Sequence, residues 1–213
     1  MIPRAPLAIT TSVRSFCKRV TAGSQPLYLD TCPVPGAAID NCFAVVERQV
    51  ALRGGERVLG WQIWELPGVM IEAEFHAVWR DPSGTLRDIT PKPDGISKIL
   101  FLPDPGRTYE KRQVNNIRQP LSNTFEVREF IAAADAQFEF MDRGERAHQH
   151  GQIALRGRER DEWLALRQRA EAASINVLQA LAEQGPESSP VSGVQQTDTK
   201  GRNAKKRARR SQR

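Results

Sequence analysis

Cysteine is scarce in this chain: the 213 residues include three, at positions 17, 32 and 42. They form no CxxC pair, and an odd, sparse set of this kind excludes the disulfide scaffold on which many small secreted domains depend. A protein that does not rely on disulfides is typical of a reducing compartment. We therefore expect a cytoplasmic protein.

Long hydrophobic runs are also missing. No stretch approaches the roughly 18 consecutive apolar residues that cross a bilayer. The N-terminal segment MIPRAPLAITTSVRSF contains scattered charges and prolines, without the continuous apolar region of a signal peptide. These absences predict a soluble chain that does not contact a membrane.

Acidic residues are absent from position 200 to the end, where eight residues are Lys or Arg. Without these eight of the 31 basic residues, 23 basic residues stand against 25 acidic ones, so the net charge of +6 belongs to this tail. Residues 185–213 are rich in Ser, Pro, Gly, Gln and basic residues and predict disorder. Such a tail could bind nucleic acid or acidic partners without sequence preference, through Lys200, Arg202, Lys205, Lys206, Arg207, Arg209 and Arg210.

Three further segments precede the tail. Residues 1–35 carry five prolines and predict an irregular lead-in, with a short strand near Tyr28. Residues 36–122 predict a compact core, which includes a strand over 99–102 and a long loop over 103–122. Residues 123–184 predict two helices that pack on this core, because apolar residues recur there at three- and four-residue steps.

A helix is predicted to begin near Cys42 and to end at Gly54-Gly55. Asp40 or Asn41 can cap its first turn, because their side chains accept hydrogen bonds from free backbone N–H groups. Cys42 therefore lies within the first turn, where the helix dipole and the free N–H groups favour a thiolate over a thiol.

Residues 57–65 and 69–80 are rich in β-branched and aromatic residues and predict two adjacent strands. In the second strand the odd-numbered positions are apolar, while Glu72, Glu74 and His76 share the other face. We expect the two glutamates to form a solvated edge, and this parity places His76 on the polar side of the strand.

Asp81-Pro82-Ser83-Gly84 predicts a tight hairpin, with Gly84 in the left-handed conformation. A three-residue loop pairs Asp81 with Thr85, and this register makes His76 and Asp88 diagonal neighbours on one face, with Cα atoms roughly 7 to 8 Å apart. A loop one residue shorter or longer would place the two side chains on opposite faces.

Cys42, His76 and Asp88, in this order on a helix and two strands, resemble the transglutaminase-like branch of the papain-like cysteine enzymes. The segment HAVWRDPSGTLRDITP is similar to that family's pattern of histidine, alternating strand, hairpin and aspartate followed by Thr and Pro. The likeness covers residues 36–91 and departs from the family at Asn41 and Arg87, which precede the cysteine and the aspartate. It implies that Cys42 is the nucleophile, His76 the general base and Asp88 the residue that orients the histidine.

The strand next to His76 offers Gln62 as a donor to a developing oxyanion. A zinc site built from Cys32, Cys42, His76, His148 and His150 is a second interpretation, but these residues lack the short spacing of structural zinc sites. Residues 201–206 resemble the C-terminal zinc motif of SecA-like proteins without any of its cysteines. We therefore predict no metal and no cofactor.

The sequence as a whole predicts an α+β fold, with a small antiparallel sheet packed by the Cys42 helix and by two C-terminal helices. The predicted function is a cysteine-dependent hydrolase, deamidase or transferase that attacks the amide or ester carbonyl of a protein, a peptide or a small amide. The alternative is a non-catalytic adaptor or scaffold whose basic tail makes the contacts.

Overall fold

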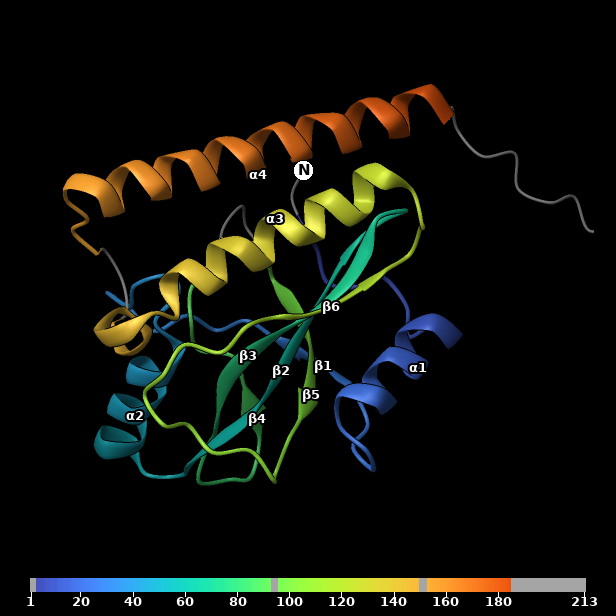
Figure 1. Ribbon diagram of the computed structural model, residues 1–213. Coiled ribbons are helices and arrows are strands. Elements are labelled where there is room, and N and C mark those ends of the chain that lie inside the picture. Colours follow the sequence, from blue (N-terminus) through green and yellow to red (C-terminus); the bar gives the residue numbers. More distant parts are fainter. Residues whose placement is uncertain (1–2, 93–95, 150–152, 185–213) are drawn as a thin grey trace, which may run out of the picture. The chain divides into compact units, whose positions relative to one another are not determined.

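A computed structural model of the chain describes residues 3–92, 96–149 and 153–184. It confirms the predicted α+β fold, an antiparallel sheet with helices packed on it (Figure 1). The predicted disordered tail, residues 185–213, lies outside the described residues. In chain order the elements are α1 (Thr11–Val20), β1 (Leu27–Asp30), α2 (Cys42–Arg53), β2 (Glu56–Leu66), β3 (Met70–Arg80), β4 (Leu86–Arg87), β5 (Lys98–Pro103), β6 (Ile117–Pro120), α3 (Phe125–Met141), a 3-10 helix (Gly144–His148) and α4 (Gly157–Gln184).

The sheet has the strand order β1-β5-β2-β3-β4, and β6 pairs with the beginning of β3. Its centre is the long β2–β3 hairpin, in which Gln62 pairs with Glu74 and Gly60 with His76. The chain after β4 returns to the chain after β1, where Thr31 bridges Asp88 and the backbone N–H of Cys32 donates to the Asp88 carbonyl at 2.7 Å. The sheet is therefore curled almost into a barrel.

Helices α1 and α2 pack on the outer face of this curled sheet. The apolar residues of α1 join the odd-numbered residues of β2 and β3 in one cluster, which includes Val13, Phe16, Trp61 and Phe75. The apolar residues of α2 form a second cluster around Ala77, also an odd-numbered residue of β3. The even-numbered face of β3 turns towards the interior of the curl, where Val78 packs with Leu29, Ile99 and Phe101.

Helices α3 and α4 cover the far end of the β2–β3 hairpin and run alongside each other (Figure 1). Val127 of α3 and Val177 of α4 share a cluster with Leu66 and Met70. The rings of Phe140 and Trp163 stack between the two helices with centroids 5.5 Å apart. The predicted packing of the C-terminal helices on the core is confirmed. No helix in the described part of the chain is both long enough and apolar enough to cross a membrane.

Besides the short 3-10 helix, one α-helix and one strand were not expected from the sequence. Residues 1–35 contain the helix α1, which Thr10 caps by accepting a hydrogen bond from the Val13 N–H. Val13, Phe16 and Cys17 are its buried residues, and their three- and four-residue spacing was a usable signal that the nearby prolines obscured. The predicted loop over 103–122 contains the edge strand β6, whose sequence IRQP shows no apolar alternation. The predicted strand near Tyr28 and the predicted strand over 99–102 are confirmed as β1 and β5.

Candidate active site

Cys42 is the first residue of α2, as the sequence predicts, and the helix ends at Gly54, whose φ is 73°. The predicted cap is wrong in one respect: Asn41 occupies the N-cap position, but its side chain makes no capping hydrogen bond. The backbone carbonyl of Asn41 does accept from the Val45 N–H at 3.0 Å. The N–H groups of the first turn are therefore not used by a side-chain cap at Asn41, and they point from the end of the helix that carries Cys42.

The hairpin between β3 and β4 has the predicted register. The Asp81 N–H donates to the Thr85 carbonyl at 3.0 Å, the Gly84 N–H donates to the Asp81 carbonyl at 2.8 Å, and Gly84 has a φ of 90°. Trp79 pairs with Arg87, one step before Asp88. This register brings the side chains of His76 and Asp88 together, and His76 Nε2 lies 3.2 Å from Asp88 Oδ1.

Cys42 reaches His76 past an open edge of β3. On the side away from β2, β6 pairs with Met70–Ala73 and β4 pairs with Trp79 and Arg80, and no strand of the described residues pairs with 74–78. Cys42 packs in one cluster with Ala77 and is also a hydrogen-bond partner of His76. Ala77 and His76 are adjacent in β3, so their side chains point to opposite faces of the strand. A side chain contacts both faces only at a strand edge.

Lys92 belongs to the same cluster and is a site residue that the sequence does not reveal. Its Nζ lies 2.9 Å from Asp88 Oδ2, 2.8 Å from Gln62 Oε1 and 3.3 Å from His76 Nε2. The Asp88 contact is an ion pair without the alignment of a good hydrogen bond. A lysine after a proline carries no local pattern that marks it, so only its position in the folded chain identifies it.

These side chains are almost completely buried. The exposed fraction is 7% for Cys42, 3% for His76, 0% for Asp88 and 1% for Gln62. Side-chain alternation predicts that His76 lies on the polar side of its strand, but that side faces the interior of the curled sheet, where the His76 ring lies edge-on to Phe101. Buried charges of this kind persist only when they are paired.

The charges of the cluster shift the pKa values of its members. Burial and the Lys92 ammonium lower the pKa of His76, but the Cys42 thiolate and hydrogen bonds with Asp88 and Cys42 outweigh them and raise it to about 9. Burial alone would raise the pKa of Asp88, yet the hydrogen bond from His76 and the positive charges of His76 and Lys92 lower it below the ordinary value. The arrangement therefore favours an imidazolium at His76 and an ionised carboxylate at Asp88.

Gln62 lies on the same interior face, because it pairs with Glu74 in the β2–β3 ladder. Its Oε1 accepts from Lys92, while its buried Nε2 has no hydrogen-bond partner among the described residues. The Gln62 side chain thus has a buried N–H donor that no protein group among the described residues accepts from. The oxyanion donor proposed from the sequence must have this property.

The expectation that Glu72 and Glu74 form a solvated edge is wrong for Glu72, while Glu74 is partly exposed. Glu72 is 8% exposed, its Oε1 lies 2.8 Å from Arg118 Nε, and it accepts a hydrogen bond from Asn116 at 2.8 Å. Glu74 accepts from the indole N–H of Trp64 at 2.6 Å. Strand β6, absent from the prediction, brings Arg118 over this part of β3.

A polar pocket of about 310 Å³ is lined by residues next to Cys42 and His76 in the chain, although neither of these two residues lines it. Asp40 and Phe43, which flank Cys42, and Glu74 and Phe75, which precede His76, line one side. Side chains from the segment before β6 and from the end of α3 line the other, among them Val114 and Met141.

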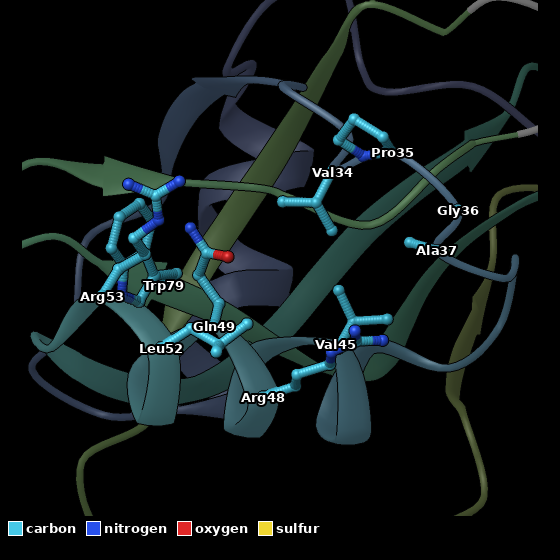
Figure 2. A pocket seen from close by; sticks show the side chains of 10 residues that line it. All are labelled: Val34, Pro35, Gly36, Ala37, Val45, Arg48, Gln49, Leu52, Arg53 and Trp79. Atoms are coloured by element: carbon cyan, nitrogen blue, oxygen red, sulfur yellow. The ribbon is translucent and has the colours of Figure 1, made fainter.

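A second pocket, of about 430 Å³, lies between α2 and the chain before it (Figure 2). Figure 2 shows Val34 and Ala37 on one side and Val45, Arg48 and Leu52 of α2 on the other. No residue of the Cys42–His76–Asp88 set lines it. Unlike the polar pocket, it also takes no residue adjacent in sequence to Cys42 or His76.

The residues named for a zinc site are not brought together. Cys32 is exposed, Cys42 lies against His76, and His148 is exposed and contacts the Lys111 carbonyl. His150 lies outside the described residues, as do the seven basic tail residues from Lys200 to Arg210. Within the described part of the chain, no group of three or more His, Cys, Asp or Glu residues could hold a metal ion.

The geometry of this site stands without support from a relative. In comparisons with known proteins, no family model, no curated protein and no solved structure matched the chain.

Proposed function

We propose that the protein is a cysteine-dependent acyl-group enzyme in which Cys42, His76 and Asp88 act as nucleophile, general base and orienting carboxylate. One observation carries this proposal: a single buried imidazole contacts a thiol at the start of a helix and a carboxylate directly after the next strand. These are the three parts that an activated thiol nucleophile requires. The resemblance to the transglutaminase-like enzymes agrees with this assignment of roles.

The tautomer of His76 follows from its contacts. Asp88 Oδ1 is an acceptor when ionised, so His76 Nε2 carries a hydrogen and donates it to Asp88. The other ring nitrogen, Nδ1, is then the one that takes the proton of the Cys42 thiol. Asp88 holds the ring in this orientation and stabilises the imidazolium that forms.

The proposed reaction has two halves. Cys42 Sγ attacks the carbonyl carbon of an amide or ester, and the carbonyl oxygen becomes an oxyanion. The N–H groups of the first turn of α2 and the Nε2 group of Gln62 are the donors proposed to bind that oxyanion. The imidazolium then gives its proton to the leaving amine or alcohol, and an acyl-thioester remains on Cys42.

In the second half, water or an amine attacks the thioester carbonyl, His76 takes the proton of the attacking group, and the Cys42 thiolate leaves. No cofactor is required for either half. The pocket lined by the neighbours of Cys42 and His76 has the volume of a small ligand or of one or two side chains. We therefore propose that a protein, peptide or small amide inserts its acyl side chain there.

The test is the pH dependence of Cys42 alkylation by iodoacetamide, in a chain whose other cysteines, Cys17 and Cys32, are changed to Ser. We expect a thiolate that reacts well below the pKa of about 8.5 of a free cysteine. His76→Ala lowers the rate at neutral pH about tenfold or more, because each unit of pKa changes the thiolate fraction tenfold. The exposed His148→Ala is the matched control and leaves the rate unchanged.

Slow alkylation with an ordinary or raised pKa, indifferent to His76→Ala, would remove the enzyme proposal. Cys42 would then be a packing residue, and the burial of the whole set would favour the non-catalytic adaptor. For that alternative, nucleic-acid binding by the full chain should fall steeply with salt and disappear on truncation at Gly185. Equal binding by the truncated chain would exclude a role for the tail.

A further inference from the structure

Lys92 occupies an unusual position for a lysine. Its side chain is 7% exposed, and the carboxylate that it pairs with is 0% exposed. Lysine is among the residue types that are rarely buried unless paired. A buried ammonium at this place therefore constrains every polar group around it.

The contacts of the ammonium determine how its neighbours are oriented. An ammonium has only hydrogen donors, so Gln62 must present Oε1 to it and turn its NH₂ group away. Asp88 likewise divides its two oxygens: Oδ2 faces Lys92 Nζ at 2.9 Å, and Oδ1 faces His76 Nε2 at 3.2 Å. Lys92 Nζ and His76 Nε2, which are then both donors, lie 3.3 Å apart. The negative charge of the Asp88 carboxylate between them offsets their repulsion.

We propose that Lys92 is a positioning residue of the thiol site: its ammonium binds Asp88 and Gln62 together, fixing which carboxylate oxygen meets His76 and leaving the Gln62 NH₂ group as an unpaired donor. The inference rests on the proposed function for its chemical meaning. Its geometry involves Lys92, Asp88, Gln62 and His76 and does not depend on the reactivity of Cys42.

Lys92 also opposes the other charges that act on His76. The titratable groups that act on this imidazole are Cys42 of α2 and Asp88 and Lys92 of the segment after β4. From β2 and β5 the neighbouring side chains are uncharged, Gln62 and Phe101. Lys92 is the one cation in this set, and its charge disfavours the imidazolium that Cys42 and Asp88 favour. It therefore holds the pKa of His76 below the value that Cys42 and Asp88 would otherwise give it.

The experiment is a titration of His76 by NMR in the full chain, with the His76 signals identified by their loss in His76→Gln. Lys92→Met keeps the length of the side chain and removes its charge. We expect the pKa of His76 to rise by about one unit or more, because an opposing charge within about 6 Å is removed. The pH midpoint of Cys42 alkylation should move in the same direction.

Two control variants separate charge from packing. Gln62→Met removes one acceptor of Lys92 without changing the buried charge, so it should move the pKa of His76 much less than Lys92→Met does. Lys98→Met removes the charge of an exposed lysine and should leave it unchanged. An unchanged pKa in folded Lys92→Met, or an equal shift in Gln62→Met, would overturn the proposal.

If Lys92→Met does not fold, the effect of the Lys92 charge can be measured by comparing Asp88→Asn with the double variant Asp88→Asn/Lys92→Met. The double variant should fold, because removing both charges leaves neither of them buried without its partner. The pKa of His76 should be higher in the double variant than in Asp88→Asn, again by about one unit. Equal values would overturn the proposal. These titrations stay informative if Cys42 proves unreactive, so a failure of the enzyme proposal is distinguishable from a failure of this one.

Discussion

Replacing Asp88 by Asn tests the centre of the site, because the two side chains have nearly the same shape and differ in charge. Asp88 accepts at Oδ1 from His76 Nε2 and from the Thr90 N–H, each at 3.2 Å. Its Oδ2 pairs with Lys92 at 2.9 Å. An asparagine can keep one oxygen towards His76 and Thr90, but its NH₂ group then meets the Lys92 ammonium, donor against donor.

The loss of stability follows from what Asp88→Asn leaves behind. Lys92 stays buried but loses the Asp88 carboxylate, so Gln62 is the one acceptor that remains of the two. Removing one partner of a buried ion pair costs about 3 to 5 kcal/mol. For a chain of this length each kcal/mol lowers Tm by roughly 2 to 4 °C, so we expect a fall of roughly 10 °C.

The dependence on pH has a definite sign. The pKa of Asp88 is lowered in the folded protein, so its contribution to stability is present above its unfolded pKa of about 3.9 and is lost as the pH falls through the folded pKa. The difference in unfolding free energy between wild type and Asp88→Asn should therefore be constant from neutral pH to about pH 5 and should shrink in stronger acid.

Urea unfolding followed by tryptophan fluorescence at a series of pH values measures this difference. Asp30→Asn is the matched control, because Asp30 pairs with Lys98 at 3.6 Å with both side chains more than half exposed. It should cost less than about 1 kcal/mol at every pH. A cost for Asp88→Asn as small as that of the control, or one that persists unchanged below pH 3, would refute the assignment of Asp88 as a buried, ionised partner.

Two further predictions concern the sheet that holds the site. Gly60→Ala should destabilise the fold by about 3 kcal/mol or more in urea unfolding, because the added Cβ would stand 2.3 Å from a backbone oxygen of β5. The control Gly106→Ala should be nearly neutral, because the nearest atom to its added Cβ is 3.9 Å away. Equal costs for the two variants would contradict the steric argument. Arg118→Met should cost about 3 kcal/mol, because it leaves Glu72 buried without its cation, while Arg169→Met breaks an exposed pair and should cost less than about 1 kcal/mol. Similar losses in these two arginine variants would show that Glu72 is stabilised without Arg118.

Much of the site could be predicted because its parts are local. The start of α2 at Cys42 and its end at Gly54 depend on residues within a few positions of each other. The hairpin register that brings His76 and Asp88 together depends on the turn Asp81–Gly84, whose loop length alone determines which side chains share a face. Local rules were less reliable for capping, since Asn41 occupies the cap position without using its side chain.

The missed features depend on contacts between distant parts of the chain. Arg118 lies over Glu72 because β6 pairs with β3 across more than forty residues of sequence. The even face of β3 is interior because the chain after β4 meets the chain after β1, which no pattern within β3 reveals. Alternation in a strand identifies two faces, but the rest of the fold decides which of them water reaches.

By itself, then, the sequence determined that a cysteine begins a helix and that a histidine and an aspartate share one face of a hairpin. Turn chemistry and side-chain alternation act over a few residues and leave little freedom. Only the tertiary structure decided that these groups are buried, that Cys42 reaches His76 at an open edge of β3, and that Lys92 joins them. Burial and ion pairing depend on which distant segments exclude water from the same place, and that is known only once the sheet has curled.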